Sequence, residues 1–387
     1  MAIKSSVYKN DPKRTYTLTS DQREEYRKTS QDSYQVKLNA EKGLIKSVHS
    51  VNVPKLNPEA LMPKIENNPL SCLSLFSGGG GLDLGFDRAG YAHLASYELI
   101  PICKDTLVTN RPNWNVFSGP EEGDVTKVDW NPYRGTVDVI HGGPPCQPFS
   151  VAGEQKGLDD ERNMWGEFNR AVNTIKPRAF VAENVLGLLS PKFKGFVDKF
   201  IIDELSDYKI KIFEMHAAHY GAPQIRRRVF FVGFRDQADF DNFVVPTPTH
   251  TFDSDLIAGS VEKTMGVREA LGLSDIGHDD LAPTIRSAFT GKRNTTSVLN
   301  SSAGQKIWGA MQLWPNGVQK SREKASEFPA KNDDFRLSVQ DVGLIQGFPE
   351  SWKFAGAVYQ QLGQIGNSVS PPVAYQVAKQ VANTLNR

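Results

Sequence analysis

The sequence predicts an α/β fold in which a mostly parallel, doubly wound sheet is covered by helices on both faces. Short apolar runs alternate with helical patterns from Ser71 onward, which is typical of such a sheet. The runs are continuous rather than alternating, as expected for strands that are buried on both faces. The first run also leads directly into a glycine-rich turn. In order, the runs are SCLSLF, VDVIHGG, RAFVAENV and RRVFFVGF.

Two segments have clear helical patterns. One segment places its apolar residues on a single face of a helix; these are Met164, Trp165, Phe168, Ala171, Val172 and Ile175. The other, PPVAYQVAKQVANTL, lies near the end of the chain and predicts a helix opened by proline.

Changes in composition divide the chain into four parts. Residues 1–69 are polar, end in a proline-punctuated stretch and are interpreted as an N-terminal extension. A DNA-binding arm, a regulatory arm and a disordered segment all stay open for this extension. Residues 70–235 carry the α/β pattern, residues 236–335 read as a separate, less regular module, and residues 336–387 return to the α/β part.

Composition excludes several classes of protein. The chain has 387 residues, 39% apolar content and a net charge of +1, which is ordinary for a globular protein. The start, MAIKSSVYKNDPKR, has no apolar core of the kind a signal peptide needs, and no long apolar run follows, so we expect a cytoplasmic protein that crosses no membrane. Its 3 cysteines are widely spaced, which favours neither a disulfide framework nor a metal site.

Charge is unevenly distributed within the irregular module. Residues 236–283 carry a net charge of about −8, and residues 284–331 carry about +6. The basic half could form a phosphate-binding face or an ordinary solvated surface.

The glycine-rich turn Gly78–Gly81 joins a predicted strand to a predicted helix. Such a turn lets the backbone approach a nucleotide-like ligand closely, although it could also be only a tight turn. Its spacing is not that of a pyrophosphate loop, which favours a smaller ligand. Glu98 lies where a carboxylate would accept hydrogen bonds from ribose hydroxyls, and Asp124 could contact the base of the same nucleoside.

Cys146 follows the run VDVIHGG within the turn PPCQP. A lone cysteine is usually a small buried hydrophobe. This one follows the carboxyl end of a predicted strand, where α/β enzymes place their active sites, and prolines fix its direction. Because a thiolate is strongly nucleophilic, Cys146 could be a catalytic nucleophile.

Two further sites could carry chemistry. Glu183 ends an apolar run, and partial burial would let its carboxyl share a proton near neutral pH; alternatively, Asn184 simply caps a helix. Arg226 and Arg228 would share one face of an extended strand and suit planar recognition of carbonyl or phosphate groups, or they could be a solubilising flank. The stretch GQIGNSVSPPVA could close over a ligand or start a helix.

Taken in order, these motifs resemble those of the DNA (cytosine-5) methyltransferases of bacterial restriction-modification systems. The resemblance covers the chain from about residue 71 to its end, except for residues 236–330. The first 69 residues match nothing in the family core, and Ser74 stands where many members carry an acidic residue. The matching motifs are F-x-G-x-G-G at Phe76–Gly81, P-C-Q at Pro145–Gln147, E-N-V at Glu183–Val185, Q-x-R-x-R at Gln224–Arg228, R-L-S with Q-G-F-P within Arg336–Pro349, and G-N-S-V at Gly366–Val369.

The resemblance implies a Rossmann-like methyltransferase fold that transfers a methyl group from S-adenosyl-L-methionine to carbon 5 of cytosine. Cys146 would add to carbon 6, Glu183 would hold or protonate ring nitrogen 3, Arg228 would bind the ring carbonyl, and Arg226 would support the cysteine loop. The residues implied around the cofactor are Phe76, Gly78, Gly80, Gly81, Glu98, Asp124, Pro145, Trp165, Asn367, Ser368 and Val369.

The resemblance also implies double-stranded DNA as the partner, with the target cytosine flipped out of the duplex. Residues 236–335 would then be a target recognition domain, and residues after Cys146 would close on the flipped base. We expect a monomer that protects host DNA, with a companion endonuclease possible. The residues expected to contact DNA are Gln147, Ser150, Arg286, Lys292 and Arg293.

Three other functions compete with this prediction. An RNA cytosine methyltransferase of similar fold is disfavoured by the sizeable separate module. A catalytically silent DNA-binding protein would not need Cys146, Glu183 and both arginines. A cysteine hydrolase would need a paired histidine, and neither His141 nor His216 lies in a recognisable pairing motif.

Overall fold

A computed structural model describes residues 49–145, 164–252, 261–287, 289, 295–327 and 334–387, together with 20, 24, 38–39, 42 and 44. The chain divides into two compact units. The larger unit comprises residues 57–265, 346–355 and 368–387, and the smaller unit comprises residues 1–56, 266–345 and 356–367.

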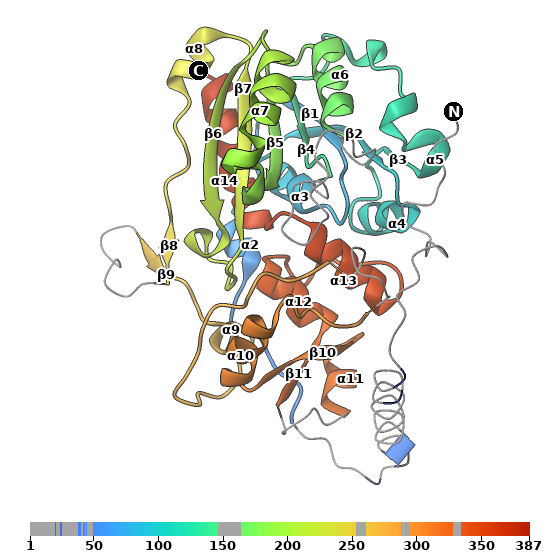
Figure 1. The fold of residues 1–387 in the computed structure, drawn as a ribbon, viewed down its shortest axis with the longest axis vertical. Helices are drawn as coiled ribbons and strands as arrows, with labels where there is room; N and C mark the ends of the chain where they lie inside the picture. The colour runs from blue at the N-terminus through green and yellow to red at the C-terminus, as the bar shows by residue number, and fades with distance from the viewer. Residues whose placement is uncertain are drawn as a thin grey trace. The chain divides into compact units, whose positions relative to one another are not determined.

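The larger unit is built on a 7-stranded sheet with the order β3-β2-β1-β4-β5-β7-β6 (Figure 1). Its neighbouring strands are parallel except at β7, which is antiparallel to both β5 and β6. The mostly parallel, doubly wound sheet predicted from the apolar runs is therefore confirmed. The strands are β1 (Ser71–Leu75), β2 (Ala92–Glu98), β3 (Val116–Ser118), β4 (Val139–Gly142), β5 (Ala179–Val185), β6 (Lys209–His216) and β7 (Arg227–Phe234).

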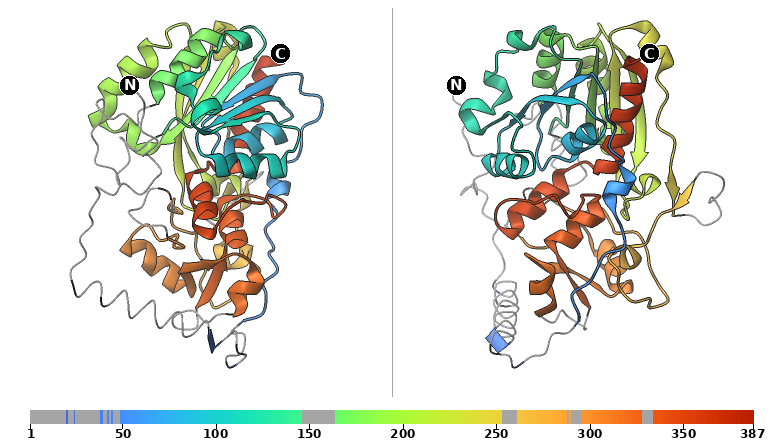
Figure 2. Two further views of the ribbon diagram at one scale, coloured as in Figure 1. Left: turned by 90° about the vertical axis from the view of Figure 1, so that its right-hand side faces the viewer. Right: turned by 180° about the vertical axis from the view of Figure 1, so that it is seen from behind.

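Helices cover both faces of this sheet, as the views in Figure 2 show. Cys72 on β1 belongs to a core with α3 (Gly81–Arg88) and α14 (Pro371–Leu385), whereas Leu73 belongs to a core with α6 (Trp165–Ile175) and α7 (Lys194–Val197). Successive strand residues point to opposite faces, so a continuous apolar run fills both cores. The predicted helices α6 and α14 are confirmed, and the latter does open with proline. The unit also contains α2 (Pro58–Leu61), α4 (Pro101–Asn110), α5 (Gly119–Glu122), α8 (Gln237–Asn242), β8 (His250–Thr251) and β9 (Glu262–Lys263).

The smaller unit has short elements around a pair of parallel strands, β10 (Leu313–Gln319) and β11 (Phe335–Ser338). It also contains α9 (Val267–Ala270), α10 (Ser302–Ala310), α11 (Arg322–Glu327), α13 (Val358–Asn367) and α12 (Val339–Gln346), whose last residue belongs to the larger unit. Among the described residues, no helix is both long and apolar enough to span a membrane.

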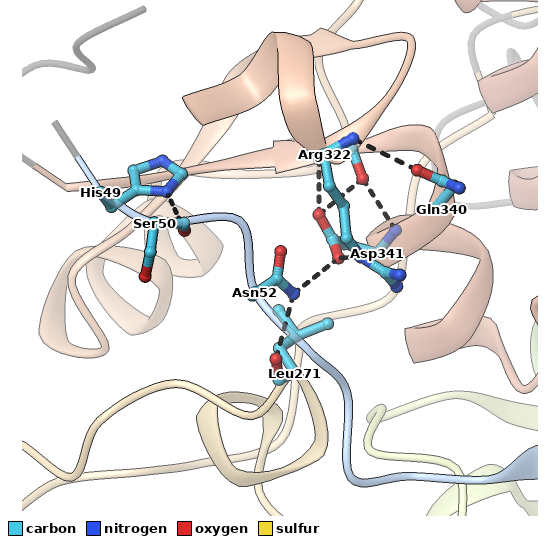
Figure 3. A network of polar contacts seen from close by, with 8 residues as sticks. His49, Ser50, Asn52, Leu271, Arg322, Gln340 and Asp341 are labelled. Carbon is cyan, nitrogen blue, oxygen red and sulfur yellow. Dashed lines mark hydrogen bonds and ion pairs between the residues drawn. The ribbon is translucent and has the colours of Figure 1, made fainter. Parts of the chain in front are cut away.

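The segment before α2 is packed into the smaller unit. The buried Asn52 amide donates to the carbonyl oxygen of Leu271 at 3.0 Å and to Asp341 Oδ1 at 3.1 Å (Figure 3). Asp341, which is fully buried, also accepts from Arg322 Nε at 2.8 Å and from the backbone N–H of Ser338 at 2.8 Å. A buried carboxylate is tolerated only when donors surround it, so Asn52 completes the environment of Asp341.

The compact units follow boundaries that differ from those read from composition. Residues 236–265 belong to the larger unit, and residues 336–387 are shared between the two units. The last part of the predicted extension is packed rather than free, because Asn52, Leu56 and Met62 are all buried. Most of residues 1–48 lie outside the described part of the chain.

Replacing Asn52 with leucine is expected to lower the free energy of unfolding by about 1–3 kcal/mol, because Asp341 loses a donor inside the protein. Val53→Ala is the matched control, since the Val53 side chain next to it is 78% exposed. Urea denaturation of the full chain measures both variants. Equal unfolding midpoints for the two would show that the Asn52 contacts are not stabilising.

Candidate active site

The glycine-rich turn connects the carboxyl end of β1 to α3. Phe76, Gly78 and Gly80 all have positive φ, with values of 57°, 53° and 84°. Positive φ is uncommon for a bulky residue such as phenylalanine and is concentrated at ligand sites and tight turns. The turn is therefore bent into a conformation that an ordinary connection would avoid.

Glu98, at the carboxyl end of β2, holds this turn. Its Oε2 accepts from the backbone N–H of Gly78 at 2.7 Å, and its Oε1 accepts from the backbone N–H of Ile100 at 2.8 Å. Burial raises the pKa of Glu98, and these backbone hydrogen bonds oppose the rise. Each carboxylate oxygen has a second lone pair, so Glu98 keeps the capacity to accept from a ligand hydroxyl.

The turn is packed from its other side by the end of the chain. A Cβ at Gly81 would overlap the carbonyl oxygen of Val369 and would lie 2.9 Å from Ser368 Cβ. A Cβ at Gly80 would lie 2.7 Å from the ring of Trp352, whose Nε1 donates to the carbonyl oxygen of Gly79 at 3.1 Å. These glycines are needed because the backbone and its neighbours approach too closely for a side chain.

A second cluster lies at the carboxyl end of β5. Glu183 Oε1 forms an ion pair with Arg228 Nε at 2.8 Å, and both side chains are largely buried, with exposed fractions of 11% and 16%. Burial raises the pKa of Glu183 above its ordinary value, although Arg228 and Arg226 both act to lower it. A raised pKa favours the protonated carboxyl, which can act as a proton donor.

The antiparallel direction of β7 brings these two residues together. Val185, the last residue of β5, pairs with Arg228 at the start of β7. In a parallel neighbour, residues that precede a strand would lie at the opposite edge of the sheet. The reversal therefore brings Arg226 and Arg228 to the same edge as Glu183.

Arg226 extends this cluster towards the glycine-rich turn. Arg226 is 2% exposed, and its Nη2 donates to the carbonyl oxygen of Ser368 at 2.7 Å. Ser368 and Val369 in turn contact Gly81. One small pocket is lined by both arginines; its lining residues are Met215, Ala217, Arg226, Arg228, Val369, Ser370 and Val373.

The turn that leads to Cys146 begins beside Glu183. A Cβ at Gly143 would lie 3.2 Å from Glu183 Oε2, and Asn184 Nδ2 donates to the carbonyl oxygen of Pro144 at 3.1 Å. Asn184 thus ties this turn to β5. Cys146 itself lies outside the described residues.

The arrangement of these motifs agrees with comparisons to known proteins. The model of the C-5 cytosine-specific DNA methylase family matches residues 70–383. The chain belongs to this family. It is a DNA (cytosine-5) methyltransferase of the restriction-modification type, and its cofactor is S-adenosyl-L-methionine.

Several relatives resemble this methyltransferase over most of its length. Type II methyltransferase M.NgoMIV of Neisseria gonorrhoeae is 32% identical over 322 residues, covering 81% of this chain and 98% of the relative. M.PspPI of Psychrobacter sp. (strain TA137) is 33% identical over 338 residues, covering 82% and 80%. A crystal structure described as a prophage-encoded DNA modification methyltransferase (E. coli) aligns with a TM-score of 0.55 and 26% identity, covering 82% of this chain and 100% of the other.

The residues of the turn fit the cofactor of this methyltransferase. A carboxylate at the end of β2, Glu98, suits ribose hydroxyls, and the bent backbone of Gly78–Gly81 lets a ligand approach closely. Within the larger unit, the structure brings together Gly81 with Ser368 and Val369, and Gly78 with Glu98.

The other residues predicted to contact cofactor or DNA differ in burial and contacts. The Asp124 carboxylate accepts from Thr126 Oγ1 at 2.7 Å at the start of a short 3-10 helix. Trp165 is fully buried and packs edge-on against Phe231 at 5.3 Å. Asn367 and Arg286 are exposed residues of the smaller unit. Pro145 is described and half-buried, whereas Gln147, Ser150, Lys292 and Arg293, which were expected to contact DNA, lie outside the described residues.

Some contributing residues received no role from the sequence. Gln224 and Gln346 are fully buried beside Arg226 and Ser368. Gln224 belongs to the motif Q-x-R-x-R and Gln346 to the motif Q-G-F-P, so these motifs could have pointed to both residues. Trp352 follows the Q-G-F-P motif and had no sequence signal that connects it with the glycine-rich turn.

Gly81→Ala is expected to weaken S-adenosyl-L-methionine binding at least about tenfold, because the added methyl group displaces Val369 or the turn. Gly166→Ala in α6 is the matched control, since a Cβ there meets nothing within 4 Å. Isothermal titration calorimetry gives both dissociation constants. Indistinguishable constants would contradict the close packing of the turn.

Proposed function

We propose that this methyltransferase acts on a cytosine flipped out of double-stranded DNA, through a covalent bond between Cys146 and carbon 6 of the ring. The observation that carries the proposal is the buried Glu183–Arg228 pair, which lies at the edge of the sheet where the turn towards Cys146 begins. Cytosine carbon 5 is a poor nucleophile until the ring is activated, so a nucleophile and a proton donor are both needed.

In the proposed sequence, the Cys146 thiolate forms a bond to carbon 6 while ring nitrogen 3 receives a proton from Glu183. The electron pair of the 5,6 double bond then becomes available at carbon 5. When bound, S-adenosyl-L-methionine supplies an electrophilic methyl group at this position. A base, for which water suffices, removes the proton from carbon 5, the thiolate leaves carbon 6, and the 5,6 double bond re-forms. Ring nitrogen 3 returns its proton to the Glu183 carboxylate, which restores the acid for the next turnover.

Arg228 and Arg226 support these steps in different ways. Arg228 already contacts Glu183 through Nε, and we propose that its guanidinium also binds the ring carbonyl as negative charge develops. Arg226 is held by the Ser368 carbonyl, next to the cofactor turn, and we propose that it supports the cysteine loop from there. Burial of both arginines strengthens these charge interactions because water screens them less.

We propose that the smaller unit reads the DNA sequence. Its exposed Arg286 and the basic segment around it suit phosphates and base edges. In this proposal the enzyme is a cytoplasmic, nucleoid-associated monomer that protects host DNA, and a companion endonuclease cuts unmethylated copies of the same site. Methyl transfer measured on duplex DNA and on tRNA separates this function from RNA modification.

Cys146→Ser should reduce methyl transfer at least about 1000-fold, since the serine hydroxyl is a far weaker nucleophile than a thiolate. DNA binding should stay within about twofold of the wild type, because no phosphate contact is lost. Transfer of a tritiated methyl group and a fluorescence anisotropy titration measure the two quantities. Cys103→Ala, which removes a free cysteine buried in α4, serves as the control; undiminished transfer by Cys146→Ser would contradict the mechanism.

A change at Glu183 should alter the pH dependence of the reaction. Only the neutral carboxyl can give up a proton, and burial raises its pKa, so the wild-type rate should fall as pH rises through that pKa. In Glu183→Gln the rate should be about 100-fold lower, and this alkaline fall should be absent. Single-turnover rates across pH provide the measurement. An unchanged alkaline fall in the glutamine variant would assign it to another group.

A further inference from the structure

Two buried glutamines connect Arg226 to the cofactor turn. Gln224 Nε2 donates to Gln346 Oε1 at 2.8 Å, and Gln346 Nε2 donates to the carbonyl oxygen of Ser368 at 2.6 Å. That same carbonyl oxygen accepts from Arg226 Nη2 at 2.7 Å. Both glutamines are 0% exposed, so their amides interact with protein rather than with bulk water.

The hydrogen bonds determine which way each amide faces. The Ser368 carbonyl can only accept, so Gln346 must present its NH₂ group there. Gln346 Oε1 then faces Gln224, which must present its own NH₂ group. With two donors the Ser368 carbonyl uses both of its lone pairs, and its direction is fixed by a neutral amide and a charged guanidinium together.

The direction of this carbonyl matters on both sides of Ser368. On one side it receives Arg226, two residues before the Arg228 that pairs with Glu183. On the other side, Ser368 Cβ and the backbone of Val369 press against Gly81 so closely that no side chain would fit there. A rotation of the Ser368 peptide would therefore move the arginine and the wall of the cofactor turn at once.

We propose that Gln346, oriented by Gln224, is a positioning residue for methyl transfer. It fixes the Ser368 carbonyl and thereby sets both the cofactor turn at Gly81 and the guanidinium of Arg226. The part that concerns Arg226 rests on the proposed function, whereas the part that concerns the cofactor turn does not depend on any catalytic role.

Gln346→Met keeps a similar volume and removes the donor to Ser368. We expect it to weaken S-adenosyl-L-methionine binding about tenfold and to lower kcat as well, because the Ser368 carbonyl loses the amide donor and keeps only Arg226 of these two donors. Gln224→Met should weaken binding only about threefold, since Gln346 can still donate to Ser368. Calorimetry without DNA and steady-state kinetics with DNA measure the two effects separately.

Tyr208→Phe provides the matched control. The Tyr208 hydroxyl donates to the carbonyl oxygen of Pro177 at 2.8 Å. Tyr208 precedes β6 and Pro177 precedes β5, so this hydrogen bond lies at the opposite edge of the sheet from Glu183. This variant loses a buried hydrogen bond to a carbonyl but should bind the cofactor normally. Cofactor affinity of Gln346→Met within twofold of this control would overturn the proposal. If Gln346→Met does not fold, the same comparison of Gln224→Met with Tyr208→Phe decides.

A double variant tests the connection to Arg226. Because Gln346 and Arg226 hold the same oxygen, Gln346→Met combined with Arg226→Lys should lower kcat by clearly less than the product of the two single effects. If the decrease in kcat of the double variant equals the product of the two single decreases, Gln346 and Arg226 do not act through the same carbonyl oxygen. A normal rate in Cys146→Ser alongside weakened cofactor binding in Gln346→Met would reject the catalytic mechanism and leave the positioning of the cofactor turn supported.

Discussion

The active site depends on one constraint, the reversed direction of β7 beside β5. The ion pair between Glu183 and Arg228 needs a residue from the end of one strand and a residue from the start of its neighbour at the same edge. Only an antiparallel pair provides that arrangement. When Glu183 is ionised, it and Arg228 offset each other's cost of burial, and for this reason the loss of either residue is severe.

The Ser368 carbonyl is the second point on which the site depends. It joins the start of β7, through Arg226, to the glycine-rich turn after β1, although β4 and β5 lie between β1 and β7 in the sheet. The end of the chain thus connects two parts of the site that the sheet itself keeps apart. Because these contacts are buried and tightly packed, small changes in backbone direction are transmitted rather than absorbed.

Much of the fold could be predicted from the sequence, because apolar runs and helical periodicity are local signals. The strands β1, β4, β5 and β7 and the helices α6 and α14 all follow from them. The direction of β7 could not be predicted, since strand direction depends on long connections and not on the run itself. The compact units could not be predicted either, because they join segments far apart in the chain. Asn52 is an isolated polar residue in the sequence, and only the folded chain shows that it contacts Asp341.

Residue roles show the same division. The motifs identified Glu183, Arg226 and Arg228, which lie together, but they gave no reason to connect Gln346 with Gly81 through Ser368. Such contacts join residues far apart in the chain, and a single sequence holds no record of them. Trp165 is the opposite case, because a local signal was enough. Its position in the apolar pattern of α6 predicts a buried side chain, and the structure shows it packed against Phe231.

The central claim is that Cys146 bonds to carbon 6 of the cytosine that is methylated, and mass spectrometry of the denatured enzyme after reaction tests it most directly. Duplex DNA carrying fluorine at carbon 5 of cytosine, with S-adenosyl-L-methionine, should trap the bond, because fluorine cannot leave as a proton does. We predict a covalent DNA adduct on the peptide that contains Cys146. Methylation of ordinary DNA with no adduct, or an adduct on a different residue, would contradict the account.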